Sequence, residues 1–365
     1  MFISAFFISA LWMLRLSAWS DDLPSWVEPV REPLVFKKTS AGGYLEITKT
    51  GTITRPKPIT SADALEKLNP GLMGTLPGLK DLITNGTVSP KFKALYDAKI
   101  EEVKGGDVME PNDFFDCATV LNLKDPKSGR SAVLFESNMD TCTDGSDPGR
   151  LSTLSDYAEA RRSGSYQPTV AYSWAKKETN TPPNPFLKYW DERIGLMRGI
   201  KKQVDELAEA DKASFWQGMK NHCDEKFTLL EKKASEYRPT LQTRRSLVAS
   251  LDPFIVVPKT WVDDQIHVGD YAAVVYEGKI YPCIIGDAGP ATKTGEGSLK
   301  LAQALNPKAS SRMSPVNKVS VTYIVFPGTA SPRATPDMTA YHQEVSRFLT
   351  EIGGLGCEVK LHAWK

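Results

Sequence analysis

The sequence predicts an α+β fold, built on a small antiparallel-rich β-barrel core that carries a long helical insertion and peripheral helices. Two observations predict the barrel. The apolar strand-like runs are short, and polar turns containing Gly or Pro join several of them as hairpins. A third observation predicts the insertion: residues 184–235 carry apolar side chains at helical spacing, with charged residues on the other faces. The aromatic residues of this segment are better explained as a packing surface than as a binding site.

The strand-like runs are rich in β-branched and aromatic residues and end at turn residues. They cover residues 43–52, 118–123, 131–137, 253–258, 271–276, 280–285 and 319–326. The clearest hairpin joins two of these runs through Gly278, which suits a tight turn. Short helices are expected at residues 61–66, 89–99, 299–305 and 339–352. The helix at 89–99 has the clearest start, because a capping Ser89 precedes Pro90 at the first helical position.

Changes in composition along the chain predict its division into segments. We expect a signal peptide at residues 1–20, a loosely packed lead-in at 21–88 and a main domain at 89–330. The helical insertion interrupts this domain at about 180–245, and a helical tail follows at 331–365. The main domain then has a size that a single domain commonly reaches.

The N-terminus has the pattern of a secretory signal. Residues 1–14 form an apolar run without charge, and Ala18 and Ser20 follow where a signal peptidase requires small side chains. The run is shorter than the roughly 20 residues that span a bilayer. We therefore expect a secreted or extracytoplasmic protein without stable membrane insertion. A buried N-terminal helix is the alternative, because Arg15 follows the run and no basic residue precedes it.

Composition excludes several classes of function. The net charge of +1 over 365 residues gives no sign of a nucleic-acid or membrane partner, and we expect no nucleic acid to bind. The five cysteines form no C-x-x-C pair and the four histidines no H-x-x-x-H pair, so we predict no metal site and no cofactor. Secretion would permit one or two disulfides, whose connectivity the sequence does not give.

The densest chemical signal is the Gly-rich stretch at residues 286–298. Asp287 follows an apolar strand directly, and Glu296 precedes a helix that begins near Ser298. Two carboxylates held across a short loop suit a glycosidase, which needs one carboxyl group as proton donor and another as base or nucleophile. The alternative is an ordinary Asp-x-Gly-Pro turn followed by a glutamate that supports a helix N-terminus.

A second acidic cluster follows the strand at 131–137. It contains Glu136, Asp140, Asp144 and Asp147. Its spacing superficially suggests calcium but does not match the EF-hand loop. Three interpretations stay open: a calcium site, a solvated acidic loop, and a carboxylate-lined subsite for a cationic sugar.

Several motifs resemble one family. Residues 139–145, Met-Asp-Thr-Cys-Thr-Asp-Gly, resemble the acidic segment of the fungal-type chitosanases, glycoside hydrolase family 75. Residues 269–290 and 294–302, the latter reading Thr-Gly-Glu-Gly-Ser-Leu-Lys-Leu-Ala, look like the core of the same family, and residues 92–99 resemble its N-terminal helix. The essential pair of that family corresponds to Asp287 and Glu296. The resemblance covers roughly residues 90–175 and 250–328, and leaves out the lead-in, the helical insertion and the tail.

The resemblance implies endo-hydrolysis of β-1,4-linked glucosamine, the polymer chitosan, with inversion. We assign Glu296 as general acid and Asp287 as general base, because a glutamic acid has the higher intrinsic pKa and burial would raise it further. The helix start near Glu296 favours its anion, so the reverse assignment stays open. The strand–Asp-x-Gly-Pro–helix pattern also looks like the double-psi barrels of certain endoglucanases and lytic transglycosylases, which is an analogy of fold alone.

Chitosan is a cationic polysaccharide, so its subsites should be acidic. The expected substrate-binding residues are Asp140 and Asp144, with Asp270 and Asp147 as weaker candidates. Tyr166, Tyr172 and Trp174 could stack on sugar rings or simply pack in the core. We expect a monomer. Two alternatives stay open: a hydrolase or lyase of another amino-sugar polysaccharide such as chitin or peptidoglycan, and a non-catalytic carbohydrate-binding envelope protein.

Overall fold

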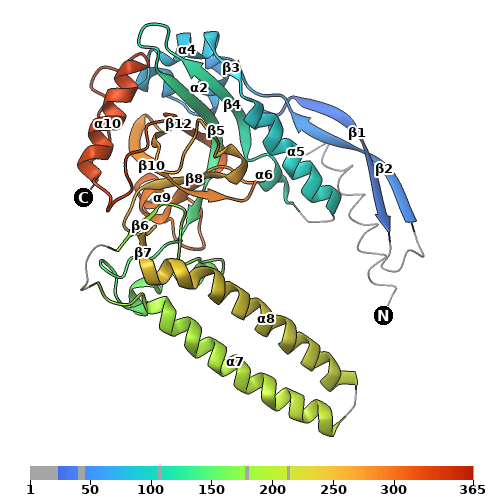
Figure 1. The fold of residues 1–365 in the computed structure, drawn as a ribbon. Helices are drawn as coiled ribbons and strands as arrows, with labels where there is room; N and C mark the ends of the chain where they lie inside the picture. Colours follow the sequence, from blue (N-terminus) through green and yellow to red (C-terminus); the bar gives the residue numbers. More distant parts are fainter. Residues whose placement is uncertain (1–23, 40–45, 106–108, 177–180, 212–213, 365) are drawn as a thin grey trace.

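The computed structural model describes residues 24–39, 46–105, 109–176, 181–211 and 214–364. Figure 1 shows a central barrel with helices around it, a β-hairpin at one side and a long pair of helices that projects from one end. The expected signal peptide at residues 1–20 lies outside the described residues. Within the described ranges, no helix combines the length and the apolar character that a membrane span requires.

Six strands close the barrel. They are β5 (Ser131–Cys142), β8 (Phe254–Pro258), β9 (Tyr271–Tyr276), β10 (Lys279–Gly289), β11 (Glu296–Ser298) and β12 (Val316–Val325). Their order is β11-β8-β10-β9-β12-β5, and β11 pairs again with β5 to close the ring. Only two of the six pairings are parallel, β8 with β10 and β5 with β11. The predicted α+β fold with an antiparallel-rich barrel is therefore confirmed; the double-psi form stays a prediction.

Two further strands extend the sheet beyond β5. They are β4 (Cys117–Lys124) and β3 (Thr87–Val88), and both pairings are antiparallel. A separate hairpin of β1 (Pro29–Thr39) and β2 (Glu46–Pro56) precedes the barrel. The sequence predicted only one strand here, at 43–52, because the prolines of β1 weaken a strand pattern. A two-stranded ribbon consists of edges alone, where proline is tolerated.

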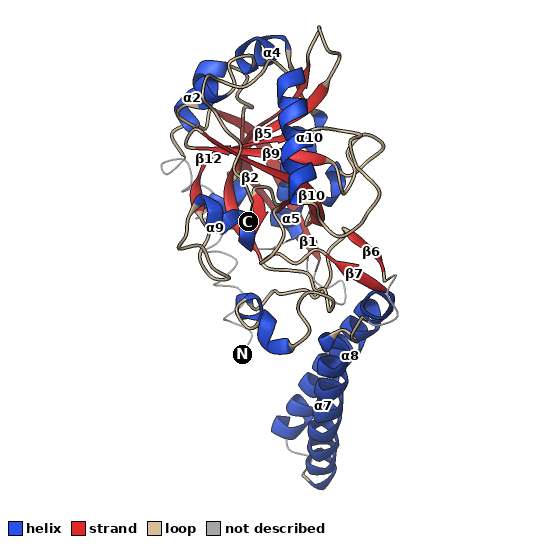
Figure 2. Ribbon diagram, turned by 90° about the vertical axis from the view of Figure 1, so that its left-hand side faces the viewer, coloured by secondary structure: helices blue, strands red, loops and turns tan. Residues whose placement is uncertain are grey.

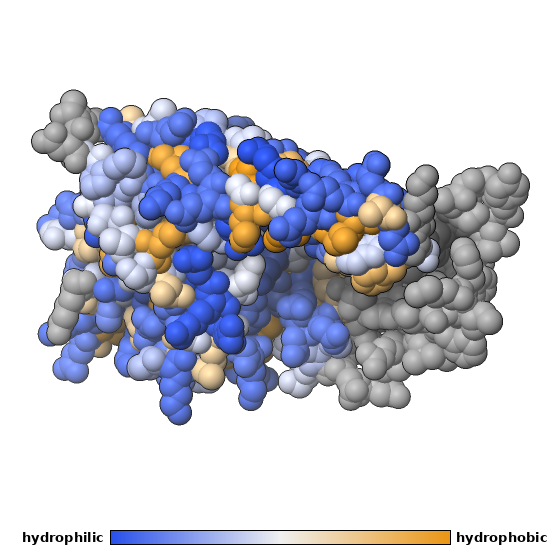
Figure 3. All heavy atoms as spheres, turned by 90° about the horizontal axis from the view of Figure 1, so that it is seen from below, coloured by the Kyte–Doolittle hydropathy of each residue, from blue (hydrophilic) through white to orange (hydrophobic). Residues whose placement is uncertain are grey.

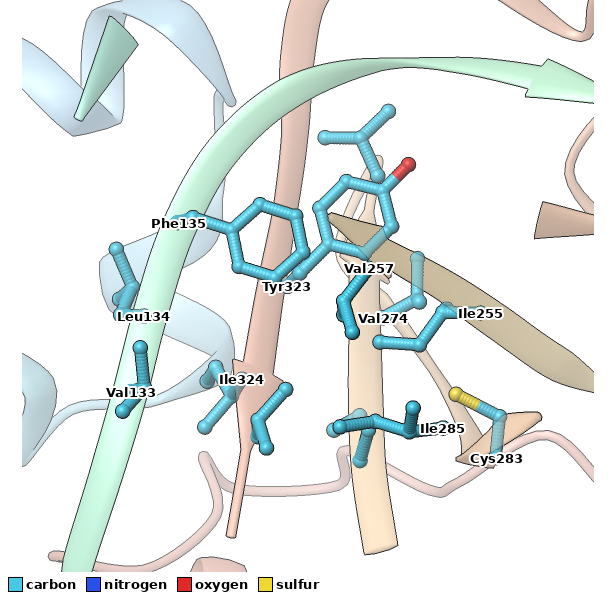
Figure 4. Close-up of a cluster of buried hydrophobic side chains, with 14 of the residues drawn as sticks. Val133, Leu134, Phe135, Ile255, Val257, Val274, Cys283, Ile285, Tyr323 and Ile324 are labelled. Carbon is cyan, nitrogen blue, oxygen red and sulfur yellow. The ribbon is translucent and has the colours of Figure 1, made fainter. Parts of the chain in front are cut away.

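The strands pack around an apolar core. Phe135 of β5 and Tyr323 of β12 are direct partners across the two strands, and their rings stack with centroids 4.5 Å apart (Figure 4). Trp261 meets the Phe135 ring edge-on at 5.2 Å. Each large apolar side chain buried in this way contributes about 1.5–3 kcal/mol to stability. Every residue of β8 is buried, which fits a strand covered on both faces.

Helices cover the outside of the barrel. They are α2 (Ala62–Leu68), α3 (Leu72–Thr75), α4 (Leu79–Asn85), α5 (Pro90–Gly105), α6 (Pro111–Phe114), α9 (Leu299–Leu305) and α10 (Met338–Glu351). The segment expected to be a loose lead-in contributes Leu65, Leu72 and Leu79 to the barrel core, each at most 1% exposed. α10 packs on β9 and β10. Side-chain caps start α2, α9 and α10, at Ser61, Ser298 and Asp337.

The long helical insertion is confirmed as a helical hairpin. It consists of α7 (Pro185–Ala210) and α8 (Ser214–Thr243), which pack on each other and project away from the barrel (Figures 1 and 2). Asn184 caps α7 by accepting the Phe186 N–H at 3.1 Å, and Pro185 occupies the first turn. At its base, β6 (Ser173–Ala175) pairs with β7 (Arg244–Ser246). This short sheet fixes where the hairpin leaves the barrel.

The five cysteines, all in described residues, are free thiols. Four are buried and Cys357 is exposed. The disulfides that the sequence left open therefore do not form in this structure. Three short 3₁₀ turns complete the fold: η1 (Leu154–Tyr157), η2 (Ala160–Ser163) and η3 (Lys259–Trp261).

A buried carboxyl group in the barrel makes stability depend on pH. Glu136 is fully buried on β5, and burial raises its pKa to about 8, opposed by a hydrogen bond from the Thr322 hydroxyl. The folded protein therefore keeps a proton that the unfolded chain loses above its ordinary pKa near 4.5. The free energy of unfolding should then fall as pH rises from about 4.5 to about 8.

The substitution Glu136→Gln should flatten this fall, because the amide stays neutral throughout. Thermal melting between pH 5 and 9 measures it. Glu101→Gln, an exposed change on α5, should leave the slope as in the wild type. An unchanged slope in Glu136→Gln would show that other groups cause the loss.

Candidate active site

Four residues lie side by side across the barrel wall. Asp287 of β10 and Glu296 of β11 are both paired with Val256 on the intervening strand β8, and Glu296 is also paired with Asp140 of β5. Paired residues on neighbouring strands project from the same face of a sheet. Strands lie about 4.8 Å apart, so the Cα atoms of Asp287 and Glu296 are separated by about 9.5 Å. The two carboxylates thus face one space, with Val256 between them.

Local irregularities place these side chains. The β8–β10 register shifts between Ile285 and Asp287, which leaves Gly286 as a bulge. A Cβ atom on Gly286 would lie 2.5 Å from the Phe254 ring, so only glycine fits here. Gly295 has φ +67°, and a Cβ there would lie 2.4 Å from the Ser137 hydroxyl oxygen. Glycines on the approach to each carboxylate therefore have packing reasons as well as conformational ones.

The paired residues Asp287, Val256 and Glu296 face a pocket of about 720 Å³. Asp287, Glu296 and Asp144 lie in its lining together with Val256 and Gly289. The other residues of the lining are Cys142, Ser165, Gln167, Thr169, Val170, Ala171, Ser173, Thr240, Lys259, Ala288, Pro290 and Lys293. A Cβ on Gly289 would lie 3.0 Å from the Val256 side chain and 3.9 Å from a carboxylate oxygen of Glu296. The absence of a side chain at Gly289 thus keeps the space between the two acids open.

Asp287 is held as a base would be. Its Oδ1 accepts hydrogen bonds from the backbone N–H groups of Ala171, at 2.8 Å, and Ala288, at 2.9 Å. Burial raises the pKa of Asp287 to about 6, and the two N–H donors oppose the rise. The carboxylate form of Asp287 therefore has two fixed hydrogen-bond donors, and its pKa of about 6 lies near neutral pH.

Glu296 has a different environment. Burial raises the pKa of its carboxyl group, Lys293 opposes the rise, and the negative charges of Asp140 and Asp287 add to it. Lys293 is in turn held by Asp140, with 3.0 Å between Nζ and Oδ2, and Asp140 also accepts from Ser314 at 2.6 Å. Asp140 thus acts on Glu296 both directly and through Lys293.

Asp144 is the third carboxyl group of the pocket. It accepts the backbone N–H of Gln167 at 2.8 Å, and burial raises its pKa to about 8, with Glu296 and Asp287 contributing further. One segment, residues 165–171, therefore holds both Asp144 and Asp287 through its backbone N–H groups. The same segment also contributes to the lining of the pocket.

A buried ion pair supports the loop before Glu296. Lys99 of α5 and Asp116 join at 2.7 Å, and their side chains are 0% and 4% exposed. The other carboxylate oxygen of Asp116 accepts the N–H of Thr294 at 3.1 Å. The Thr294 hydroxyl also lies 3.1 Å from that of Ser137. Sequence analysis missed this support because Lys99 reads as one more charge on an amphipathic helix.

Residues 209–360 match the family model of fungal chitosanase of glycosyl hydrolase group 75. This match indicates a chitosanase-like glycoside hydrolase. The resemblance drawn from its motifs is thereby confirmed. The matched residues include both Asp287 and Glu296, whereas Asp140 and Asp144 lie outside them. The match also takes in α8 and α10, which the sequence prediction had placed outside the resemblance. No match is found among curated proteins.

Two expected acidic subsite residues of this chitosanase-like hydrolase lie elsewhere. Asp270 is fully buried, and its carboxylate accepts the backbone N–H groups of His267, Thr329 and Ala330 at 2.7–2.8 Å. It organises two loops and has no surface for a sugar. Asp147 is equally buried and pairs with Arg150 and Arg245, each at 2.6 Å. The structure therefore removes both from the candidate subsites.

The expected aromatic platforms are also placed differently. Tyr166 packs on Phe186 in a second apolar cluster, and its hydroxyl donates to the Gly145 carbonyl at 2.9 Å. It lines another pocket and not the one that holds the carboxylates. Tyr172 and Trp174 are each 7% exposed and belong to the main core. None of the three offers a ring to a sugar in the carboxylate pocket.

Within the described part of the chain, no group of three His, Cys, Asp or Glu side chains is arranged to hold a metal ion. The acidic cluster of residues 136–147 is instead dispersed. Glu136 lies in the core and Asp147 in an ion-pair network, while Asp144 lines the pocket and Asp140 stands outside its lining, paired with Lys293. Sequence proximity therefore brought together residues with three separate roles.

Proposed function

We propose that this enzyme hydrolyses the β-1,4 bonds of glucosamine polymers by inversion, with Asp287 and Glu296 as the catalytic pair. The observation that carries the proposal is their common pairing with Val256, which sets two carboxylates two strands apart on one face. Inverting glycosidases need about 6.5–9.5 Å between carboxyl groups to admit a water molecule. Two strand spacings limit the Cα atoms of the pair to about 9.5 Å apart, which keeps the two side chains on one stretch of the barrel wall.

We assign Glu296 as the acid and Asp287 as the base. Asp287 has two backbone donors that favour its anion, as a base requires before it takes a proton from water. Glu296 lies in a less solvated position, where burial and neighbouring negative charges favour its protonated form. Its raised pKa lets it deliver a proton to the leaving oxygen. Lys293 lies close enough to favour the anion that remains after this transfer.

Product analysis with glucosamine oligomers of defined length tests the reaction. Freshly released sugar should carry the α configuration at the new reducing end, detected by proton NMR before mutarotation. Release of the β anomer would indicate retention and overturn the assignment of Asp287 as a base. Absence of hydrolysis of glucosamine oligomers, with hydrolysis of their acetylated counterparts, would overturn the substrate.

Asp144 is proposed as the subsite residue for a glucosamine ammonium group. With its pKa raised to about 8, the carboxyl group of Asp144 is protonated at neutral pH, and an adjacent ammonium group would favour its ionisation. Asp144→Asn keeps the shape but removes this charge. We expect KM for glucosamine oligomers to rise about 10-fold, as for loss of a charged hydrogen bond, with little change for acetylated oligomers.

Steady-state kinetics on both oligomer series measure this difference. Asp264→Asn, an exposed aspartate outside the pocket lining, serves as the matched control. A fall in kcat by a factor of about 100 or more on both substrates would instead place Asp144 in the chemical step.

The lysines of the pocket favour a second candidate substrate. Lys259 and Lys293 both line it, and a sugar ammonium beside either would be repelled. A partly acetylated polymer, with a neutral acetamido group at that position, meets this objection. Comparison of oligomers acetylated at single positions would distinguish the two substrates.

We also propose that the protein is secreted and acts as a monomer. The apolar N-terminal run and the small residues after it support secretion. N-terminal sequencing of the protein from culture medium, and light scattering of the purified enzyme, test the two statements.

A further inference from the structure

A second pocket lies between the base of the helical hairpin and the loop that carries η2. Its volume is about 470 Å³. Aromatic side chains form much of its wall: Tyr166, Phe186, Tyr189 and Trp190. The rings are in mutual contact, with centroids 5.2 Å apart for Tyr166 and Phe186 and 5.5 Å apart for Tyr189 and Trp190. The glycosidase chemistry described above uses none of them.

Four cations surround this aromatic wall. They are Arg161, Arg193, Lys226 and Lys233, and the lining contains no Asp or Glu. Within the described residues, none of the four has a carboxylate partner in an ion pair. This contrasts with the rest of the hairpin, where Lys188, Arg198, Lys201 and Lys220 each pair with an acid. The surface around the hairpin is mainly hydrophilic, with apolar patches between the polar groups (Figure 3).

Tyr189 brings two of these charges together. The guanidinium of Arg161 lies 4.7 Å from the centre of its ring and that of Arg193 lies 5.4 Å from it. Arg193 also donates to the Tyr189 hydroxyl at 3.0 Å. Two guanidinium groups on one ring repel each other, and among the described residues neither forms an ion pair that would offset the repulsion. An anion placed between them would remove this cost.

The loop between residues 164 and 169 separates this pocket from the catalytic one. Gly164, Tyr166 and Pro168 line the cationic pocket, while Ser165, Gln167 and Thr169 line the carboxylate pocket. Residues of this loop thus contribute alternately to the two pockets. The loop therefore lines both pockets: the charged residues of one are all cations, whereas the other contains both acids and lysines.

We propose that the cationic pocket binds an anionic saccharide, whose pyranose ring carries a carboxylate or a sulfate ester. Aromatic faces suit the apolar face of a sugar ring, and arginines suit bidentate binding of a carboxylate or sulfate. A glucosamine polymer is excluded, because its ammonium groups would meet four unpaired cations. The ligand of this pocket is therefore chemically different from the substrate of the catalytic pocket.

Calorimetric titration of the full chain with cellobiouronic acid tests the proposal. Two ligands serve as controls. Cellobiose has a hydroxymethyl group in place of the carboxylate, and inorganic sulfate has the charge without the sugar. We expect cellobiouronic acid to bind at least about 10-fold more tightly than either, with affinity falling as salt rises. Equal binding of cellobiose would overturn the role of charge, and equal binding of sulfate would overturn the role of the sugar. Absence of binding would overturn the proposal altogether.

Substitutions locate the site. Arg193→Gln should weaken cellobiouronic acid binding about 10-fold, as loss of a charged hydrogen bond does. Lys188→Gln removes a cation from the same helix but outside the pocket lining, and should leave binding unchanged. The double substitution Lys226→Gln/Lys233→Gln, on the facing helix, should weaken binding by a similar factor and gives an independent check if Arg193→Gln folds poorly. Equal affinity in all variants would place the ligand elsewhere.

Discussion

Replacing Glu296 with Gln should lower kcat for hydrolysis of glucosamine oligomers by about 10²–10⁴-fold, the usual contribution of a general acid. The amide preserves the shape of the side chain and cannot supply the proton. Asp287→Asn should have an effect of similar size, because its amide cannot take a proton from water. Both variants should still bind oligomers, since neither loses the acidic subsite at Asp144.

Two measurements separate the roles of the pair. The Glu296 variant should regain activity on substrates whose leaving group needs no proton, such as aryl glycosides. The Asp287 variant should instead be rescued by azide, which replaces the activated water. The opposite pattern would exchange the two roles. Glu277→Gln, an exposed glutamate in the β9–β10 turn, makes the same chemical change outside the pocket and should keep full activity.

The dependence of kcat/KM on pH is a further consequence. Asp287 has a pKa near 6, so the rate should rise as pH increases through this value and the carboxylate base forms. Burial also raises the pKa of Glu296, and a fall of the rate at higher pH that Glu296→Gln abolishes would belong to this carboxyl group. Asp287→Asn should remove the rise near pH 6 from the residual activity. Persistence of that rise would assign it to another group.

The sequence places the proposed catalytic pair along the chain more fully than it places it in space. A strand end at Asp287 and a helix start near Glu296 are local features, and turn residues mark both. Their common neighbour Val256 is not local, because it depends on closure of the barrel between β8, β10 and β11. Strand pairing across a closed barrel is set by the packing of the whole core, which one sequence does not reveal.

Burial explains most of the site residues that sequence analysis misplaced. Asp270 follows a glycine before a strand, a pattern equally suited to a loop at the surface. In the structure its carboxylate replaces the turn hydrogen bonds of two loops. Tyr166 was expected either to stack on a sugar ring or to pack in the core. In the structure it completes an apolar cluster with Phe186 of the insertion. Such contacts join distant segments and leave no local pattern.

Asp116→Ala should cause the largest loss of stability among single changes near the site. It leaves the Lys99 ammonium buried without its carboxylate and removes the acceptor of the Thr294 N–H. Breaking a buried ion pair from one side costs about 3–5 kcal/mol in the free energy of unfolding. Activity should fall as well in the variant that remains folded, because Thr294 and Gly295 lead directly into Glu296.

Chemical denaturation of the double-mutant cycle formed by Lys99→Met, Asp116→Leu and their combination separates the pair from its surroundings. The combined change Lys99→Met/Asp116→Leu removes both charges, so it should cost less stability than Asp116→Ala alone. Lys202→Met serves as the control, because it breaks a surface ion pair in which Lys202 is 80% and Glu206 66% exposed. It should change the free energy of unfolding by about 0.5 kcal/mol or less. A double variant as unstable as Asp116→Ala would show that packing, and not the unpaired ammonium, dominates the loss. Lys99 and Asp116 join α5 to the loop before Glu296. Burying this ion pair costs desolvation energy, and in return it holds the proposed acid Glu296 in its pairing with Val256, beside Asp287.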